Sequence, residues 1–192
     1  MISKGITILM RRLLLLLVLA GGLLLTVPAL AQEGGETFVV TAGELPAAVA
    51  AAADGDTIEV NGGILQGSLK IDKSVTIRGK NWPVIDGLDQ GTVVHISAPG
   101  VVFSGFLIKN SGSTIEQENS GIAVVAPEVV VEYNRFENTL FGIYLKEAHH
   151  SVVRGNEVSS KDLEVQRRGD PIVVEVDEGP RARSLEDFLS DE

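Results

Sequence analysis

The segment that decides the fold is VVFSGFLIKN, residues 101–110, because it recurs 28 residues later as VVVEYNRFEN, residues 129–138. Matched positions keep their character: Val101 with Val129, Phe103 with Val131, Ile108 with Phe136, and Asn110 with Asn138. The alignment extends back to VTIRG, residues 75–79, and forward to VVRGNEV, residues 152–158. A repeat of this length is typical of a solenoid built from stacked copies of one unit.

A second family of apolar segments repeats in step with the first. Its members are VHISAPG (94–100), IAVVAPE (122–128) and IYLKEAH (143–149), and Ile172-Val173-Val174 begins a fourth. Apolar residues alternate with variable ones in each member, so one face of every strand points inward. One coil cannot bury that face alone, so coils stack in parallel. We therefore predict an all-β, right-handed parallel β-helix over residues 32–178.

Asparagine and glycine recur at fixed places in the repeat. Asn110 recurs as Asn138, and Asn134 recurs as Asn156. Asparagine tolerates a left-handed backbone, and its amide bonds the backbone of neighbouring coils. We interpret these positions as a structural turn ladder rather than as a binding site, with Gly79, Gly105 and Gly155 at related bends for steric reasons (residue positions).

The two ends of the predicted solenoid differ. PAAVAAAADGD, residues 46–56, predicts a short N-terminal helix that begins at Pro46, ends at Asp54-Gly55 and covers the first coil. Residues 179–192 form a polar tail, which we expect to be a poor cap for the last coil. That coil is therefore expected to fray or to self-associate.

Residues 1–31 have the pattern of a cleaved secretory signal peptide of the general secretory route. A basic start with Lys4, Arg11 and Arg12 is followed by an apolar run over residues 13–27 and by Ala29-Leu30-Ala31. We expect cleavage after Ala31 and a periplasmic mature protein that does not itself span the membrane. An uncleaved anchor, twin-arginine export and a start at Met10 stay open as alternatives.

The composition of the mature chain limits its partners. Without residues 1–31 it carries 13 basic and 26 acidic residues, which argues against nucleic acid and anionic membrane surfaces. The sequence holds no cysteine, and both methionines lie in the predicted signal peptide. No disulfide frame or sulfur ligand is therefore available.

His149-His150 is the strongest candidate for metal binding, because imidazole suits copper and zinc and both side chains can converge from a turn. The alternative is a pair of solvated turn histidines. The residues alone define no cofactor, and copper is the candidate. His95 alternates with inward residues, so we expect it on an outer face beside Ala123 and Tyr144.

We expect no enzyme activity, because no catalytic constellation is visible in the sequence. Glycoside chemistry needs paired carboxylates or a base matched with cations. Asp86, Asp89, Glu116 and Glu118 are present, but none recurs with another carboxylate one coil away. We interpret Trp82 as a packing residue at a turn. Arg168-Gly169-Asp170 is interpreted as a turn rather than as an adhesion signal.

The chain resembles the N-terminal part of the NosD family over about residues 37–170. The resemblance is carried by AADGDTIEVNGG (52–63), IDKSVTIRGKNWPVIDG (71–87), GTVVHISAPGVVFSGFLIKNSGS (91–113), EQENSGIAV (116–124) and FGIYLKEAHHSVVRGNEV (141–158). It implies a periplasmic β-helix protein that assists copper-centre assembly in nitrous oxide reductase. The implied partners are the membrane subunits of an ABC transporter, the reductase and a separate copper chaperone.

The resemblance ends near Pro171, where family members continue with a Gly-Ile coil and are roughly twice this long. We expect a truncated or frameshifted reading frame, although a genuine short form stays open because Ile172, Val174 and Val176 alternate cleanly. Two other functions stay open: a carbohydrate-binding or carbohydrate-active β-helix, and a fragment without function. A shared β-helix fold does not decide between them.

Overall fold

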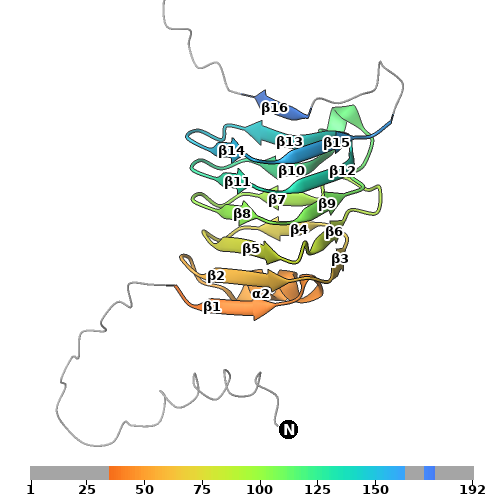
Figure 1. The fold of residues 1–192 in the computed structure, drawn as a ribbon. Coiled ribbons are helices and arrows are strands. Elements are labelled where there is room, and N and C mark those ends of the chain that lie inside the picture. The colour runs from red at the N-terminus through yellow and green to blue at the C-terminus, as the bar shows by residue number, and fades with distance from the viewer. Residues whose placement is uncertain (1–34, 163–170, 176–192) are drawn as a thin grey trace, which may run out of the picture. The chain divides into compact units, whose positions relative to one another are not determined.

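The computed structural model describes residues 35–162 and 171–175. The expected signal peptide (1–31), the Arg168-Gly169-Asp170 string and the polar tail (179–192) lie outside these ranges. Within them the chain folds as a parallel β-helix whose strands form three sheets, A, B and C (Figure 1). Every strand pairing is parallel, as the repeat predicts.

Each sheet takes one strand from every full coil, and β1 adds a sixth strand to sheet A. Sheet A consists of β1 (Thr37–Val40), β2 (Thr57–Asn61), β5 (Thr76–Lys80), β8 (Val102–Ser104), β11 (Val130–Glu132) and β14 (Val152–Arg154). Sheet B consists of β3 (Ile64–Gln66), β6 (Val84–Asp86), β9 (Leu107–Lys109), β12 (Arg135–Thr139) and β15 (Glu157–Ser160). Sheet C consists of β4 (Leu69–Ile71), β7 (Val94–Ile96), β10 (Ser120–Val124), β13 (Phe141–Lys146) and β16 (Ile172–Glu175).

The chain passes through sheets A, B and C in turn and rises by one strand at each pass. Figure 1 shows sheets A and B at the front and the strands of sheet C running back behind them, which makes the winding right-handed. The predicted register is confirmed: Phe103 pairs with Val131, Ile108 with Phe136, and Ile122 with Ile143. Ile172 pairs with Ile143, so the fourth member of the second family is confirmed as well.

The core consists of the inward residues of all three sheets, stacked in columns along the axis. Ile77, Phe103 and Val131 form one such column in sheet A and are almost completely buried. Phe106 adds a ring beside Phe103, with the two centroids 4.5 Å apart. Because each inward side chain lies on its counterpart in the next coil, the apolar surface of every coil is covered by its neighbours.

One asparagine ladder runs through the interior. Asn134 is 1% exposed, and its amide donates to Phe103 O (3.2 Å) and to Asn156 Oδ1 (3.1 Å) while its oxygen accepts from Phe106 N (3.1 Å). Asn156 repeats the pattern one coil later by donating to Val131 O (2.9 Å). These amides satisfy backbone groups at a corner where the chain leaves sheet A, which buried polar groups require.

A second, solvent-facing asparagine ladder follows sheet B. Asn110 and Asn138 both have left-handed backbones, with φ of 57° and 53°. Asn138 Nδ2 donates to Asn110 Oδ1 (2.7 Å), and Asn110 Nδ2 donates to Asp86 Oδ1 (2.8 Å). The predicted turn ladder is therefore confirmed, but as two ladders of which only this one uses the left-handed backbone.

The corner after sheet A carries the predicted glycine positions. Four successive coils share an equivalent position at this corner. It is occupied in turn by Gly79, Gly105, Tyr133 and Gly155. Gly105 (φ 83°) and Gly155 (φ 63°) are left-handed, whereas Gly79 continues strand β5 and has no positive φ. A Cβ at Gly79 would collide with the carbonyl oxygen of Gly105, so close approach of the coils explains this glycine.

A short helix lies at the N-terminal end of the stack, as predicted. The 3-10 turn η2 (Ala42–Glu44) leads into α2 (Leu45–Ala51), which contacts β1, β2 and β4 and buries Leu45 and Val49. The helix ends earlier than the predicted Asp54-Gly55. Asp56 is the reason, because its carboxylate accepts from Ala53 N (2.8 Å) and Glu36 N (2.7 Å) and draws the chain into β2. No helix in the described part of the chain has the length and apolarity to cross a membrane.

The last described coil leaves part of its inner face uncovered. Ile172 and Val174 continue the inward column of sheet C, yet they are 46% and 61% exposed. The polar tail that we expected to be a poor cap for this coil lies outside the described residues, so its capping of the coil stays a prediction. Fraying and self-association themselves stay predictions.

An ion pair ties distant coils together along the B–C corner. Lys161, which follows β15, is buried, and its Nζ lies 2.6 Å from Asp89 Oδ1 in the turn between β6 and β7. Asn138 Nδ2 also reaches Asp89 Oδ1, at 3.4 Å. The pair links residues 72 positions apart, whereas most contacts of the solenoid join neighbouring coils.

Replacement of Asn134 by alanine should destabilise the fold strongly. The change leaves Phe106 N–H buried without its side-chain partner and removes the amide bonds to Phe103 O and Asn156 Oδ1, which should lower the free energy of unfolding by about 2–4 kcal/mol. Equilibrium denaturation of the mature chain measures the effect.

The control variant is Asn138→Gly, which keeps the left-handed turn and removes only the exposed hydrogen bonds to Asn110 and Asp89. It should cost less than about 1 kcal/mol. Equal losses in the two variants would contradict the structural role assigned to the interior ladder.

Candidate functional site

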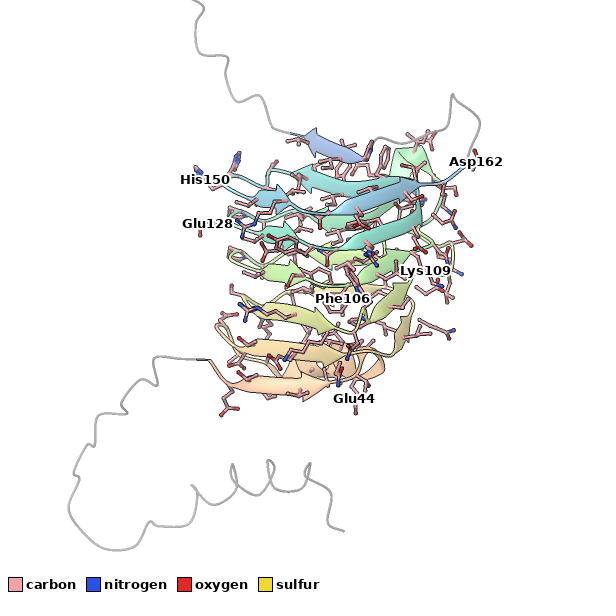
Figure 2. All side chains as sticks on the ribbon, in the orientation of Figure 1. Glu44, Phe106, Lys109, Glu128, His150 and Asp162 are labelled. Carbon is pink, nitrogen blue, oxygen red and sulfur yellow. The ribbon has the colours of Figure 1, made fainter. Side chains whose placement is uncertain are left out.

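The histidine pair lies at the tip of the turn between β13 and β14. Both side chains are exposed, and His150 has a left-handed backbone with φ of 59°. The carbonyl of His149 accepts a hydrogen bond from Glu128 N (2.9 Å), which holds the turn against the coil before it. Figure 2 shows His150 and Glu128 at the same edge of the stack, opposite Lys109 and Asp162.

The register brings one carboxylate near the pair. Val129 N donates a hydrogen bond to Ser151 Oγ (3.1 Å), and Val130 pairs with Val152, so Glu128 and His150 occupy equivalent turn positions one coil apart. No group of three His, Cys, Asp or Glu side chains in the described part of the chain is arranged to hold a metal ion. The pair thus offers two imidazoles with a carboxylate on the neighbouring coil, a partial ligand set that suits copper or zinc.

His95 lies on the outer face of sheet C, as predicted. Its register partners are Lys70 in β4 and Ala123 in β10, and Ala123 pairs in turn with Tyr144. Partial burial between these neighbours lowers the pKa of His95, and the positive charge of Lys70 lowers it further. At neutral pH this imidazole is therefore uncharged and adds no cation to the face.

The candidate acids are engaged in structural contacts. Burial alone would raise the pKa of Asp86, but hydrogen bonds from Asn110 and Leu88 N and the ion pair with Lys109 (3.3 Å) lower it overall. A carboxyl group with a lowered pKa is poorly suited to donate a proton as a general acid at neutral pH. Asp89 is held by Lys161 in the tie described above.

The remaining acids lie in an exposed loop. Glu116 belongs to the short 3-10 helix η3 (Ile115–Gln117), and Glu118 follows it with a left-handed φ of 53°. Glu116 is exposed and Glu118 is half-buried.

The structure also assembles a cleft that the sequence did not indicate. Trp82 lies at the corner between β5 and β6. The guanidinium carbon Cζ of Arg135, in β12, is 4.1 Å from the centre of the Trp82 ring. Trp82 thus packs, as predicted, but across two coils rather than within its own turn. The rest of the lining comes from Tyr133, Asn134, Gly155 and Glu157. The one signal that could have found it is Tyr133, which stands where the repeat has glycine.

Comparisons of the chain with protein-family models, with curated proteins and with solved structures gave no match.

We expect mature protein to bind Cu²⁺ through the histidine pair and to lose this binding in the double variant His149→Ala/His150→Ala. Isothermal titration measures it. Because Glu128 is the nearest equivalent carboxylate, Glu128→Gln should weaken binding less than the double variant does. An unchanged titration in the double variant would rule the site out.

Protonation of His95 should destabilise the protein. The folded-state pKa is lowered from its ordinary value of 6.5, so the unfolded chain takes up the proton more readily. The stabilisation is present above pH 6.5 and is lost as the pH falls through the folded-state pKa. The variant His95→Asn should therefore gain stability relative to the wild type between pH 7.5 and 5.5, measured by urea denaturation. A constant difference across this range would contradict the assignment.

Proposed function

We propose that this chain is a periplasmic accessory module for copper-centre assembly of nitrous oxide reductase, and that it acts by protein contact at an ABC transporter. The observation that carries the proposal is the resemblance to NosD proteins over residues 37–170. The described residues of that stretch fold into successive, regularly stacked coils. The stretch that resembles the family therefore forms a rigid scaffold.

Each distinctive phrase of the resemblance combines a partly buried strand with an exposed corner or turn. GKNWPVIDG, residues 79–87, covers the end of β5, the exposed corner at Trp82 and strand β6. FGIYLKEAHH, residues 141–150, covers β13 and the exposed histidine turn. Residues at such positions are available to a partner, which supports a function in docking.

The outer face of sheet C is suited to protein contact. Lys70, His95, Ala123, Tyr144 and Val173 follow one another in register, one per coil. Strands in a sheet lie about 4.8 Å apart, so the column is evenly spaced on a rigid support. Lys70 and His95 are exposed in it, whereas Tyr144 is only 8% exposed. Its centre, Ala123, is small and leaves room for a side chain of the partner.

Deletion of the gene in the source organism should yield a nitrous oxide reductase that lacks copper and activity. The reductase is purified from deletion and wild-type cells, and its copper content and turnover are measured. The gene restored in trans should recover both. Normal activity and copper content after deletion would refute the proposed function.

Three variants then identify the docking face: Ser104→Arg on sheet A, Glu137→Arg on sheet B and Ala123→Arg on sheet C. Each places a bulky cation on one outer face. We expect Ala123→Arg to lose rescue and the other two to retain it, with unchanged thermal unfolding in all three as the control. Full rescue by Ala123→Arg would exclude sheet C as the docking face.

A further inference from the structure

A cleft of about 210 Å³ lies at the corner between sheets A and B. Its lining comes from three coils and comprises Trp82, Tyr133, Asn134, Arg135, Gly155 and Glu157. Asn134 is buried and belongs to the interior ladder, whereas Trp82, Tyr133, Arg135 and Glu157 are exposed and are used neither by the copper proposal nor by the core. The cleft combines two aromatic residues with a guanidinium and a carboxylate, a combination typical of a small polar-ligand site.

Trp82 lies in the cleft with an unfavourable, left-handed backbone conformation. Its φ is 49°, that of Asn81 is 60°, and Pro83 follows, a neighbour that disfavours this conformation further. A left-handed backbone costs a bulky residue stability and calls for a reason. Although Arg135 covers one face of the ring, Trp82 is still 44% exposed. The strain thus places an indole where solvent and ligands reach it.

Tyr133 stands at a position that the repeat otherwise gives to glycine. Gly105 precedes it and Gly155 follows it in the same column, and Tyr133 shares their left-handed backbone with φ of 54°. Its ring lies against Gly155, where an added Cβ would come within 2.7 Å of it. Tyr133 is nevertheless 58% exposed. A second aromatic residue is therefore presented at the same corner against local backbone preference.

The polar groups of the cleft are balanced in charge. Arg135 Nε donates to Glu157 Oε2 at 3.0 Å, and the same guanidinium lies over the Trp82 ring. The pair leaves further guanidinium N–H donors and a second carboxylate oxygen for a ligand, and Tyr133 adds a hydroxyl. A neutral ligand with several hydroxyl groups matches this set, whereas the acidic mature chain repels a polyanion.

We propose that this cleft binds one pyranose unit of a neutral glycan. The apolar C–H face of the sugar ring packs on the exposed aromatic surface of Trp82 and Tyr133, and its hydroxyls hydrogen-bond the Arg135–Glu157 pair. A cleft smaller than those of drug-sized ligands holds a single sugar unit and gives an affinity in the millimolar range. The proposal rests on the geometry of the cleft and is independent of the copper function.

Trp82 is the sole tryptophan of the sequence, so intrinsic tryptophan emission reports on this cleft. The mature chain is titrated with cellohexaose, maltohexaose and chitohexaose. We expect at least one to produce a saturable change in emission. The variant Tyr133→Gly restores the glycine of the repeat and so should keep the fold, and it should weaken that binding at least tenfold. Val125→Ala, an exposed apolar truncation outside the cleft lining, is the matched control and should leave the affinity unchanged.

Two outcomes would overturn the proposal. The first is the absence of a saturable change with all three oligosaccharides in the wild-type protein. The second is equal affinity in wild type and Tyr133→Gly, with circular dichroism showing that both are folded. Saturable binding of a proline-rich peptide together with no response to sugars would assign the cleft to a peptide instead.

Discussion

The structure depends on the parallel hydrogen bonding of each strand to its counterpart in the next coil. This pairing fixes the height of every coil, and it places each inward residue on the equivalent residue of its neighbour, as with Ile77, Phe103 and Val131. It also leaves the corners with backbone groups that no strand can pair. The interior amides of Asn134 and Asn156 supply those partners, so the ladders follow from the same constraint as the core.

The same constraint leaves the outer faces and corners free to vary. An outward residue such as Ala123 must only fit beside its register neighbours, and a corner residue must only tolerate the turn. Tyr133 and Trp82 use this freedom, since both accept a left-handed backbone to reach solvent. Residues available for binding in this solenoid therefore lie on corners and outer faces, while the inward columns stabilise the fold.

The repeat predicted the later coils and missed the first. Phe103 and Val131 are 28 residues apart, but the equivalent Ile58 and Ile77 are only 19 apart, so β2, β3 and β4 escaped the alignment. The end of α2 depended on the hydrogen bonds of Asp56, which no helix propensity encodes. The cleft was not predictable, because it joins Trp82 to Arg135 across two coils through corner geometry. The histidine turn was placed correctly, whereas its carboxylate neighbour became visible only through the register.

The ion pair between Lys161 and Asp89 changes how such a stack of coils should unfold. A solenoid whose coils touch only their neighbours loses structure gradually from its ends, as a chain of weakly coupled units. The buried Lys161 forms an ion pair with Asp89, which lies in a turn several coils earlier. This ion pair couples the first and last coils of the segment between the two residues. We therefore expect the coils between Asp89 and Lys161 to unfold together rather than one after another.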